Sequence, residues 1–237
     1  MTPAVALFSP LDQLVARGPF FLFVLQSAIL YLLYKNMKTF VFDFDGVIGN
    51  TFELYAEFLA KFMRISLPRA RRYMREHSLN NRKQSLVKTL GKNFYMRRFE
   101  AYVKRQLDRD ILFPEVLEQI ELLSGNKYIV SRNHVRVCLE ILQEQAILFK
   151  EVYGYNNAKS KVHALRNILH QDDLVKEDLV FVSDTIGDFA EVTQILKPSQ
   201  VYLVTWGFNT AETIVEYDQS IQTLHSPQEL AALNQLH

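Results

Sequence analysis

The sequence predicts an α/β fold with a Rossmann-like parallel sheet as its core and an all-helical cap inserted after the first strand. Short apolar runs rich in β-favouring residues alternate with helical segments over the second half of the chain. A long helical segment separates the first of these runs from the others. At 237 residues, the chain is long enough for one catalytic domain and a small accessory module.

The first strand is predicted at Lys38 to Phe42, because this short apolar run ends at the acidic Asp43. Asp45-Gly46 then breaks the strand, and Asn50 or Thr51 is suited to cap the helix that follows.

The segment from Phe52 to about Arg109 has a helical pattern, in which Leu54, Phe58 and Phe62 recur every four residues. Phe113-Pro114 marks the point where the chain leaves this helical segment and returns to the core. We therefore predict a helical basic cap at 51–110, and a catalytic core formed by 38–50 and 111–237.

Strands and helices alternate after the cap, which predicts a parallel sheet with helices on both faces and right-handed crossovers. Strands are predicted at 127–130, 149–153, 179–183 and 200–205, and helices at 115–123, 135–143, 160–170, 186–196 and 227–236.

The cap differs from the rest of the chain in charge. It holds 15 Lys and Arg against 6 Asp and Glu, a net charge of +9, so the remainder carries −8 of the chain's total of +1. The basic side chains either form a solvated face or recognise an additional anionic group on a substrate. Tyr73, Tyr95, Phe99 and Tyr102 interleave with them, as in single-strand nucleic-acid binding, but no nucleic-acid fold motif accompanies them, so such a partner is not favoured.

Residues 1–37 form a hydrophobic extension whose most apolar part is 19–34. That run is shorter than the roughly 20 residues of a membrane span. It is a non-native or marginal extension ahead of a start at Met37, a membrane-associating helix, or a helix packed on the domain. The single cysteine, Cys138, cannot form an internal disulfide. A cytoplasmic protein is expected, with membrane association through 19–34 as the alternative.

Chemistry-bearing residues follow four of the predicted strands. They are Asp43 and Asp45, then Ser131, then Lys159 and Lys161, and finally Asp184 and Asp188. Ligands bind at the carboxyl ends of strands in open parallel sheets, so these residues should converge. Carboxylates so close together would repel, and a divalent cation resolves this; oxygen-only ligation favours Mg²⁺.

This set suits phosphoryl transfer, which needs a nucleophile, charge compensation and a proton donor. We expect Asp43 to attack phosphorus and Asp45 to act as the general acid and base. Ser131 and Lys161 would hold the phosphate of a small phosphorylated substrate, with Lys161 preferred to Lys159 because it begins a helix. The predicted metal ligands are Asp43, Asp45, Asp184 and Asp188.

The motifs resemble those of the haloacid dehalogenase superfamily. Phe42 to Ile48 is similar to its first motif, Val130-Ser131 to its second, Lys161 to its third and Val182 to Asp188 to its fourth. The resemblance, with Asp45 present, implies the phosphatase branch, and the helical insertion resembles the caps of phosphoglycolate-phosphatase-like members. Ser183 stands where many relatives have Gly.

Two other functions compete with that of a small-molecule phosphatase. A phosphosugar mutase resembles this family and keeps both aspartates, but returns the phosphoryl group to its substrate. A non-catalytic protein that binds anions or nucleic acid through the cap would be expected to lose Asp43 or Asp45, and both are present.

Overall fold

A computed structural model describes residues 37–79, 92–107 and 109–235. The chain divides into two units, Met1–Met37 and Lys38–His237, and the description concerns the second. The predicted extension, including its apolar run 19–34, therefore lies outside the described residues apart from Met37. Within the described ranges, the longest apolar helices still fall short of what a membrane crossing requires.

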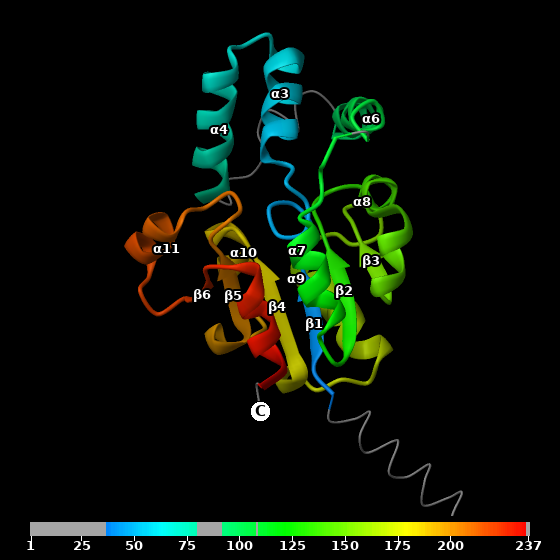
Figure 1. Cartoon of the computed structure of the whole chain (residues 1–237), viewed down its shortest axis with the longest axis vertical. Helices are drawn as coiled ribbons and strands as arrows, with labels where there is room; N and C mark the ends of the chain where they lie inside the picture. The colour runs from blue at the N-terminus through cyan, green and yellow to red at the C-terminus, as the bar shows by residue number, and fades with distance from the viewer. Residues whose placement is uncertain (1–36, 80–91, 108, 236–237) are drawn as a thin grey trace, which may run out of the picture. The chain divides into compact units, whose positions relative to one another are not determined.

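The core is a six-stranded parallel sheet with the strand order β3-β2-β1-β4-β5-β6 (Figure 1). β1 lies in the interior between β2 and β4, so that Phe42 pairs with Ile129 on one side and Val182 on the other. The strands are β1 Thr39–Phe42, β2 Asn126–Val130, β3 Glu151–Tyr153, β4 Leu179–Ser183, β5 Val201–Val204 and β6 Gln222–Leu224.

Both faces of the sheet are covered. Side chains alternate along each strand, so successive residues pack into two different hydrophobic clusters. Phe40 and Phe42 pack into one hydrophobic cluster, which also holds residues of α7, α8 and η4. Val41, between them, packs into the other, with residues of α9, α10 and α11. The helices of the core are α7 Pro114–Glu121, α8 Val135–Leu142, α9 Lys161–Gln171, α10 Ile186–Val192 and α11 Ala211–Tyr217, with 3₁₀ segments η1 Gln143–Leu148, η2 Lys176–Asp178, η3 Pro198–Gln200 and η4 Pro227–Gln235.

The predicted fold class is confirmed, with three local differences. The helix predicted to run from 186 to 196 ends at Val192, and the last segment is a 3₁₀ helix. α11 and β6 were not predicted. Thr210 begins α11 by accepting a hydrogen bond from the Thr213 N–H, an ordinary N-cap signal that the sequence carried.

The insertion after β1 contains the helices α3 Phe52–Met63, α4 Leu67–Leu79 and α6 Lys92–Val103. α3 and α4 pack together as neighbours, and α6 contacts α3 (Figure 1). The predicted periodicity is confirmed for Leu54 and Phe58, which are buried, whereas Phe62 is only partly buried. The domain boundaries 51 and 110 remain predictions.

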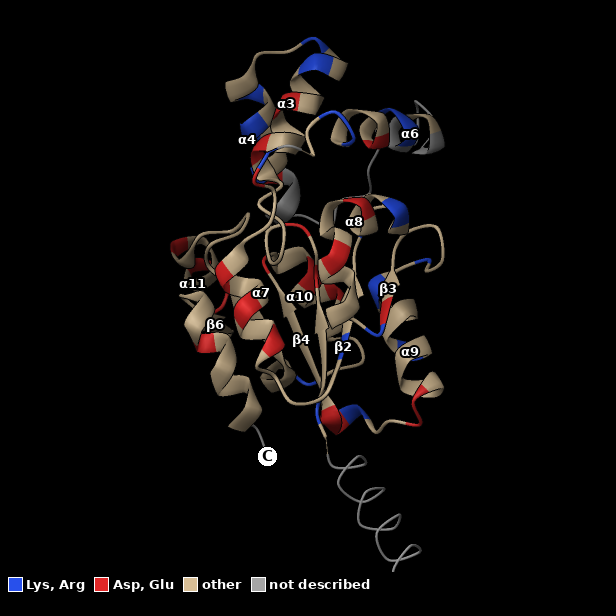
Figure 2. Cartoon of the chain, turned by 45° about the vertical axis from the view of Figure 1, so that its right-hand side comes forward, with Lys and Arg blue, Asp and Glu red and all other residues tan. Residues whose placement is uncertain are grey.

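Basic positions outnumber acidic ones along α4 and α6 of the cap (Figure 2). Some basic side chains of the cap pair with acidic ones. Arg71 forms two-pronged hydrogen bonds to Glu53, and Arg109 pairs with Glu57 at 3.0 Å. Arg82, Lys83 and Lys88 lie outside the described residues. Phe99 is 1% exposed, so this ring packs in the core and offers no face to a nucleic-acid base.

Candidate active site

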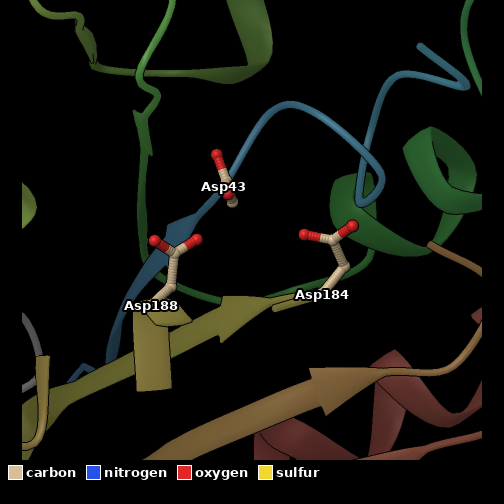
Figure 3. Close-up of side chains that lie close together, drawn as sticks. All are labelled: Asp43, Asp184 and Asp188. Atoms are coloured by element: carbon tan, nitrogen blue, oxygen red, sulfur yellow. The ribbon is translucent and has the colours of Figure 1, made fainter. Parts of the chain in front are cut away.

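Asp43, Asp184 and Asp188 form a compact acidic group at the carboxyl ends of β1 and β4 (Figure 3). Each is buried and offers one carboxylate oxygen, and these oxygens lie within 4.8 Å of one another. Asp43 directly follows β1, and its backbone N–H donates to the Val182 carbonyl at 2.8 Å. Its Oδ1 accepts a hydrogen bond from the Phe44 N–H at 2.7 Å. The position of the nucleophile candidate is therefore set by the sheet itself.

Lys161 supplies positive charge to this group. Its Nζ lies 2.6 Å from Asp43 Oδ2 and 3.0 Å from Asp188 Oδ2, and it donates to the Val130 carbonyl at 3.2 Å. It is the first residue of α9, which Ser160 caps by accepting from the His163 N–H. Lys159 is exposed. The structure thus brings Lys161, and not Lys159, to the predicted site.

Asp188 is held by several donors. Ser183 Oγ donates to its Oδ2 at 2.9 Å, and Arg132 pairs with its Oδ1 at 2.9 Å. Arg132 also pairs with Glu191, which accepts from the Lys161 N–H and so ties α10 to the start of α9. Arg132 is therefore a salt-bridging residue of the site. The hydroxyl of Ser183, at the position where many relatives have Gly, takes part in the site.

The loop after β5 holds Asp184 in position. The sequence analysis did not predict this role for the loop. The Phe208 N–H donates to Asp184 Oδ2 at 2.7 Å, and Asn209, 2% exposed, donates its N–H to the Asp184 carbonyl. Gly46 (φ +75°) and Gly207 allow this close approach. A Cβ at Gly46 would lie 1.9 Å from Asp184 Oδ2, and one at Gly207 would lie 2.6 Å from the Gly46 carbonyl oxygen.

Burial and nearby charges shift the pKa values of the three carboxyl groups. Burial raises the pKa of Asp43 to about 8, against the opposing attraction of Lys161. Burial and the charge of Asp43 raise the pKa of Asp184 well above its usual range. Burial would also raise the pKa of Asp188, but Lys161 and Arg132 outweigh it and hold that pKa well below its usual range. Without a metal, protons therefore compensate part of the negative charge.

Asp45 lies beside this group in a separate hydrogen-bond network. Asn133 Nδ2 donates to both of its oxygens, at 3.0 and 2.8 Å, and Thr51 Oγ1 donates to Oδ1 at 2.9 Å. The Ser131 hydroxyl lies 3.3 Å and the Tyr55 hydroxyl 3.4 Å from its Oδ2. Ser131 and Asp45 are thus neighbours, as predicted. The side chain of Asp45 is not part of the acidic group, and its role as a metal ligand remains a prediction.

The sequence analysis assigned Thr51 a different role and assigned none to Asn133. Thr51 stands at the N-cap position of α3, but its hydroxyl bonds Asp45 and not the helix. Asn133 follows the second strand but had no assigned role. Tyr55, from α3, donates to Asn133 Oδ1 and stacks on Phe99 of α6, with ring centroids 4.3 Å apart. The cap therefore contributes directly to the surroundings of Asp45.

Asp45 is poised to exchange a proton near neutral pH. Burial raises its pKa to about 6, while the hydrogen bond from Thr51, the charge of Lys161 and the hydroxyls of Ser131 and Tyr55 lower it. A carboxyl group of this acidity can donate a proton in one step and accept one in the next.

The acidic group fits a divalent cation. Its candidate ligands are all oxygens, which suits a hard cation. Asp184 Oδ1 is buried and has no hydrogen-bond partner within the part of the chain that the structure describes. A buried carboxylate oxygen without a partner is costly, and a cation at this point would satisfy it.

The chain belongs to the family of haloacid dehalogenase-like hydrolases, because residues 40–193 match that family. The matched range contains Asp43, Asp45, Ser131, Lys161, Asp184 and Asp188. A comparison with curated proteins gives no significant match.

Solved structures share the fold. A haloacid dehalogenase-like hydrolase of Streptococcus pneumoniae is 19% identical, with a TM-score of 0.62, covering 84% of this chain and 98% of its own. A putative phosphoglycolate phosphatase of Lactobacillus plantarum is 15% identical, with a TM-score of 0.64, covering 83% and 99%. A putative β-phosphoglucomutase of Thermotoga maritima is 18% identical, with a TM-score of 0.59, covering 84% and 99%.

Proposed function

We propose that this protein is a Mg²⁺-dependent phosphatase that hydrolyses a small phosphorylated metabolite through a phosphoaspartate on Asp43. The main support is that one loop holds two carboxylates whose bonding partners differ. Asp43 lies beside Lys161 in the acidic group, and Asp45 lies two residues away among hydroxyl and amide donors. This division suits a nucleophile and a proton-transfer group.

In the first half-reaction, a carboxylate oxygen of Asp43 attacks the phosphorus atom, and the bond from phosphorus to the leaving oxygen breaks. Asp45, protonated, gives its proton to that leaving oxygen. Lys161 and Ser131 lie beside these two carboxylates, and they would bind the phosphate oxygens.

In the second half-reaction, Asp45 accepts a proton from water, and the water oxygen attacks the phosphorus of the acyl phosphate. The bond from phosphorus to the Asp43 oxygen breaks, which releases inorganic phosphate and restores Asp43. The proton that Asp45 gave up is thereby replaced, so the cycle is balanced.

Asp43 and Asp184 are the residues best placed to hold Mg²⁺, because side chains already bind both oxygens of Asp188, Arg132 at Oδ1 and Lys161 and Ser183 at Oδ2, whereas Lys161 binds only Oδ2 of Asp43. When bound, Mg²⁺ neutralises negative charge that accumulates on the phosphate oxygens. Asp188 would then orient Lys161.

Phosphate release from a panel of phosphorylated metabolites and from p-nitrophenyl phosphate tests the proposal. Release should require Mg²⁺, stop with EDTA and return when Mg²⁺ is restored, whereas Ca²⁺ should restore it poorly because its coordination is looser. Asp45→Asn is the matched variant, since it keeps the Asp43 nucleophile and loses the proton donor. Full release in EDTA would overturn the Mg²⁺ requirement.

A phosphosugar mutase is the second candidate, supported by the shared fold of the Thermotoga protein named as a putative β-phosphoglucomutase. A mutase would convert a phosphosugar to its isomer and release little inorganic phosphate. Following one phosphosugar by ³¹P NMR separates the two functions.

A further inference from the structure

We infer that Asn133 is a positioning residue for Asp45, and that the hydroxyl of Tyr55 in the cap fixes the direction in which the Asn133 amide points. This rests on the proposed phosphatase function, in which Asp45 transfers the proton. It names the side chain through which the cap acts on that step. Asn133 lies in the loop between β2 and α8.

The backbone of Asn133 is held by two neighbouring segments. Its N–H donates to Ser131 Oγ at 2.9 Å, and its carbonyl accepts from the Tyr155 N–H at 2.9 Å. Gly154 approaches the same carbonyl so closely that a Cβ there would lie 2.4 Å from its oxygen. The residue is 2% exposed, so the side chain starts from a fixed and buried point.

The side-chain amide of Asn133 joins Asp45 to Tyr55. Its Nδ2 donates to both oxygens of Asp45, at 3.0 and 2.8 Å, and its Oδ1 accepts from the Tyr55 hydroxyl. The reverse orientation would put the amide oxygen against the two oxygens of Asp45, where an acceptor is repelled. The hydroxyl donor at Oδ1 therefore favours the orientation in which the amide donates to Asp45.

Tyr55 is in turn held by packing inside the cap. Its ring stacks on that of Phe99, with centroids 4.3 Å apart and planes 12° apart. Phe99 is 1% exposed and belongs to α6, whereas Tyr55 belongs to α3 (Figure 1). Two cap helices thus determine where the hydroxyl lies, and through it the direction of the Asn133 amide.

The two contacts from Nδ2 favour the ionised form of Asp45. That form remains once the proton has passed to the leaving oxygen, and hydrogen bonds to a charged acceptor are stronger than those to a neutral one. Asn133 therefore lowers the barrier when the leaving oxygen needs a proton. It matters little for an ester whose leaving group departs as a stable anion.

First-turnover measurements on a series of aryl phosphates, made by rapid mixing in Mg²⁺, test the inference. The series is 2,4-dinitrophenyl, 4-nitrophenyl, 4-chlorophenyl and phenyl phosphate, which keeps one ring and varies the acidity of the released phenol. Asn133→Ala should release phenol from phenyl phosphate about 10- to 100-fold more slowly than the wild type, the size expected for hydrogen bonds to a charged group. Release of 2,4-dinitrophenol should change by less than about threefold.

Tyr55→Phe removes the hydroxyl and keeps the ring that stacks on Phe99. It should show the same dependence on the leaving phenol with a smaller loss, about three- to tenfold on phenyl phosphate. Asp45→Asn gives the limiting dependence, because it has no proton to donate.

Matched controls remove the same groups elsewhere in the molecule. Asn126→Ala deletes an amide that donates to Asp172 at 3.2 Å, and Tyr102→Phe deletes a cap hydroxyl that donates to Glu57 at 2.8 Å. Both should keep the wild-type dependence on the leaving phenol. Melting temperatures check that every variant is folded.

Equal slowing of all four esters by folded Asn133→Ala would indicate a structural role and overturn the inference, and so would an unchanged rate on phenyl phosphate. A wild-type dependence in Tyr55→Phe would overturn the role of the cap hydroxyl. Should Asn133→Ala not fold, Tyr55→Phe decides alone. Failure of the proposed function is a separate result, namely no Mg²⁺-dependent phosphate release by the wild type from any ester tested.

Discussion

The acidic group and the cap handle charge in opposite ways. At the ends of β1 and β4, buried carboxylates share partners: Lys161 serves both Asp43 and Asp188, and Ser183 donates to Asp188. In the cap, the ion pairs of Arg71 with Glu53 and of Arg109 with Glu57 have side chains that are 30–44% exposed. Buried, shared charges interact strongly and respond together, whereas exposed pairs are screened by water. Function should therefore depend on the first kind, and the second should tolerate change.

The largest effect is expected at the nucleophile. Asp43→Asn keeps the size of the side chain and removes its anionic oxygen, so phosphate release should fall by at least ~10³-fold. The same change removes a buried negative charge, so the metal-free variant should unfold at no lower a temperature than the wild type at pH 8. Rapid-quench assays and thermal unfolding measure both quantities. Appreciable turnover in pure Asp43→Asn would refute the assignment.

Removal of the shared cation should come next. Lys161→Met leaves Asp43 and Asp188 without their common partner, and breaking a buried pair in this way costs about 3–5 kcal/mol. The loss should be largest at high pH, where protons cannot substitute for the ammonium group. Chemical denaturation at pH 6 and pH 8.5 measures it, with Lys159→Met as the exposed control. Equal stability of the two variants would contradict the shared role.

Magnesium should stabilise the protein more as the pH rises. The pKa of Asp43 is raised to about 8 and that of Asp184 is raised above its usual range. A carboxyl whose pKa is raised by folding contributes stability that is present at low pH and lost as the pH rises from about 4 to about 8.

Mg²⁺ binds the deprotonated carboxylates, so protons compete with it below about pH 8, where the Asp43 carboxyl becomes protonated. The increase in melting temperature on adding Mg²⁺ should accordingly be greater at pH 8.5 than at pH 6. Asp184→Asn should lose most of this increase, and an increase that does not change with pH would disprove the coupling.

The smallest effect is expected in the cap. Arg109→Ala removes an ion pair with Glu57 whose arginine side chain is 41% exposed, so the loss of stability should be below about 1 kcal/mol. Phosphate release should remain unchanged. A large loss of either would remove the distinction between the two regions.

Most of the fold could be predicted from local sequence patterns, because apolar strands and amphipathic helices each have a recognisable spacing of apolar residues. The same patterns predicted that one site would bring together Asp43, Ser131, Lys161, Asp184 and Asp188, since parallel strands place their carboxyl ends at one edge of the sheet. The short elements α11 and β6 were missed, and the helix at Ile186 was predicted too long.

The contacts around Asp45 could not be predicted in the same way. Thr51 had an equally good local role as a helix cap, and only the folded chain shows its hydroxyl at Asp45. Tyr55 and Asn133 come from α3 and from the loop after β2, 78 residues apart, so no local spacing joins them. The same is true of Phe208, whose backbone N–H meets Asp184 whatever its side chain.

The contacts that fix Asp184 come late in the chain. The family match ends at residue 193, yet the N–H groups of Phe208 and Asn209 that hold Asp184 lie beyond it. During synthesis, every carboxylate of the acidic group is therefore made before the backbone that orients one of them. A nascent chain halted between residues 193 and 207 would carry all the candidate catalytic side chains and still lack the backbone N–H groups that orient Asp184. The proposed activity thus depends on a stretch of chain that contributes none of the proposed reactive groups.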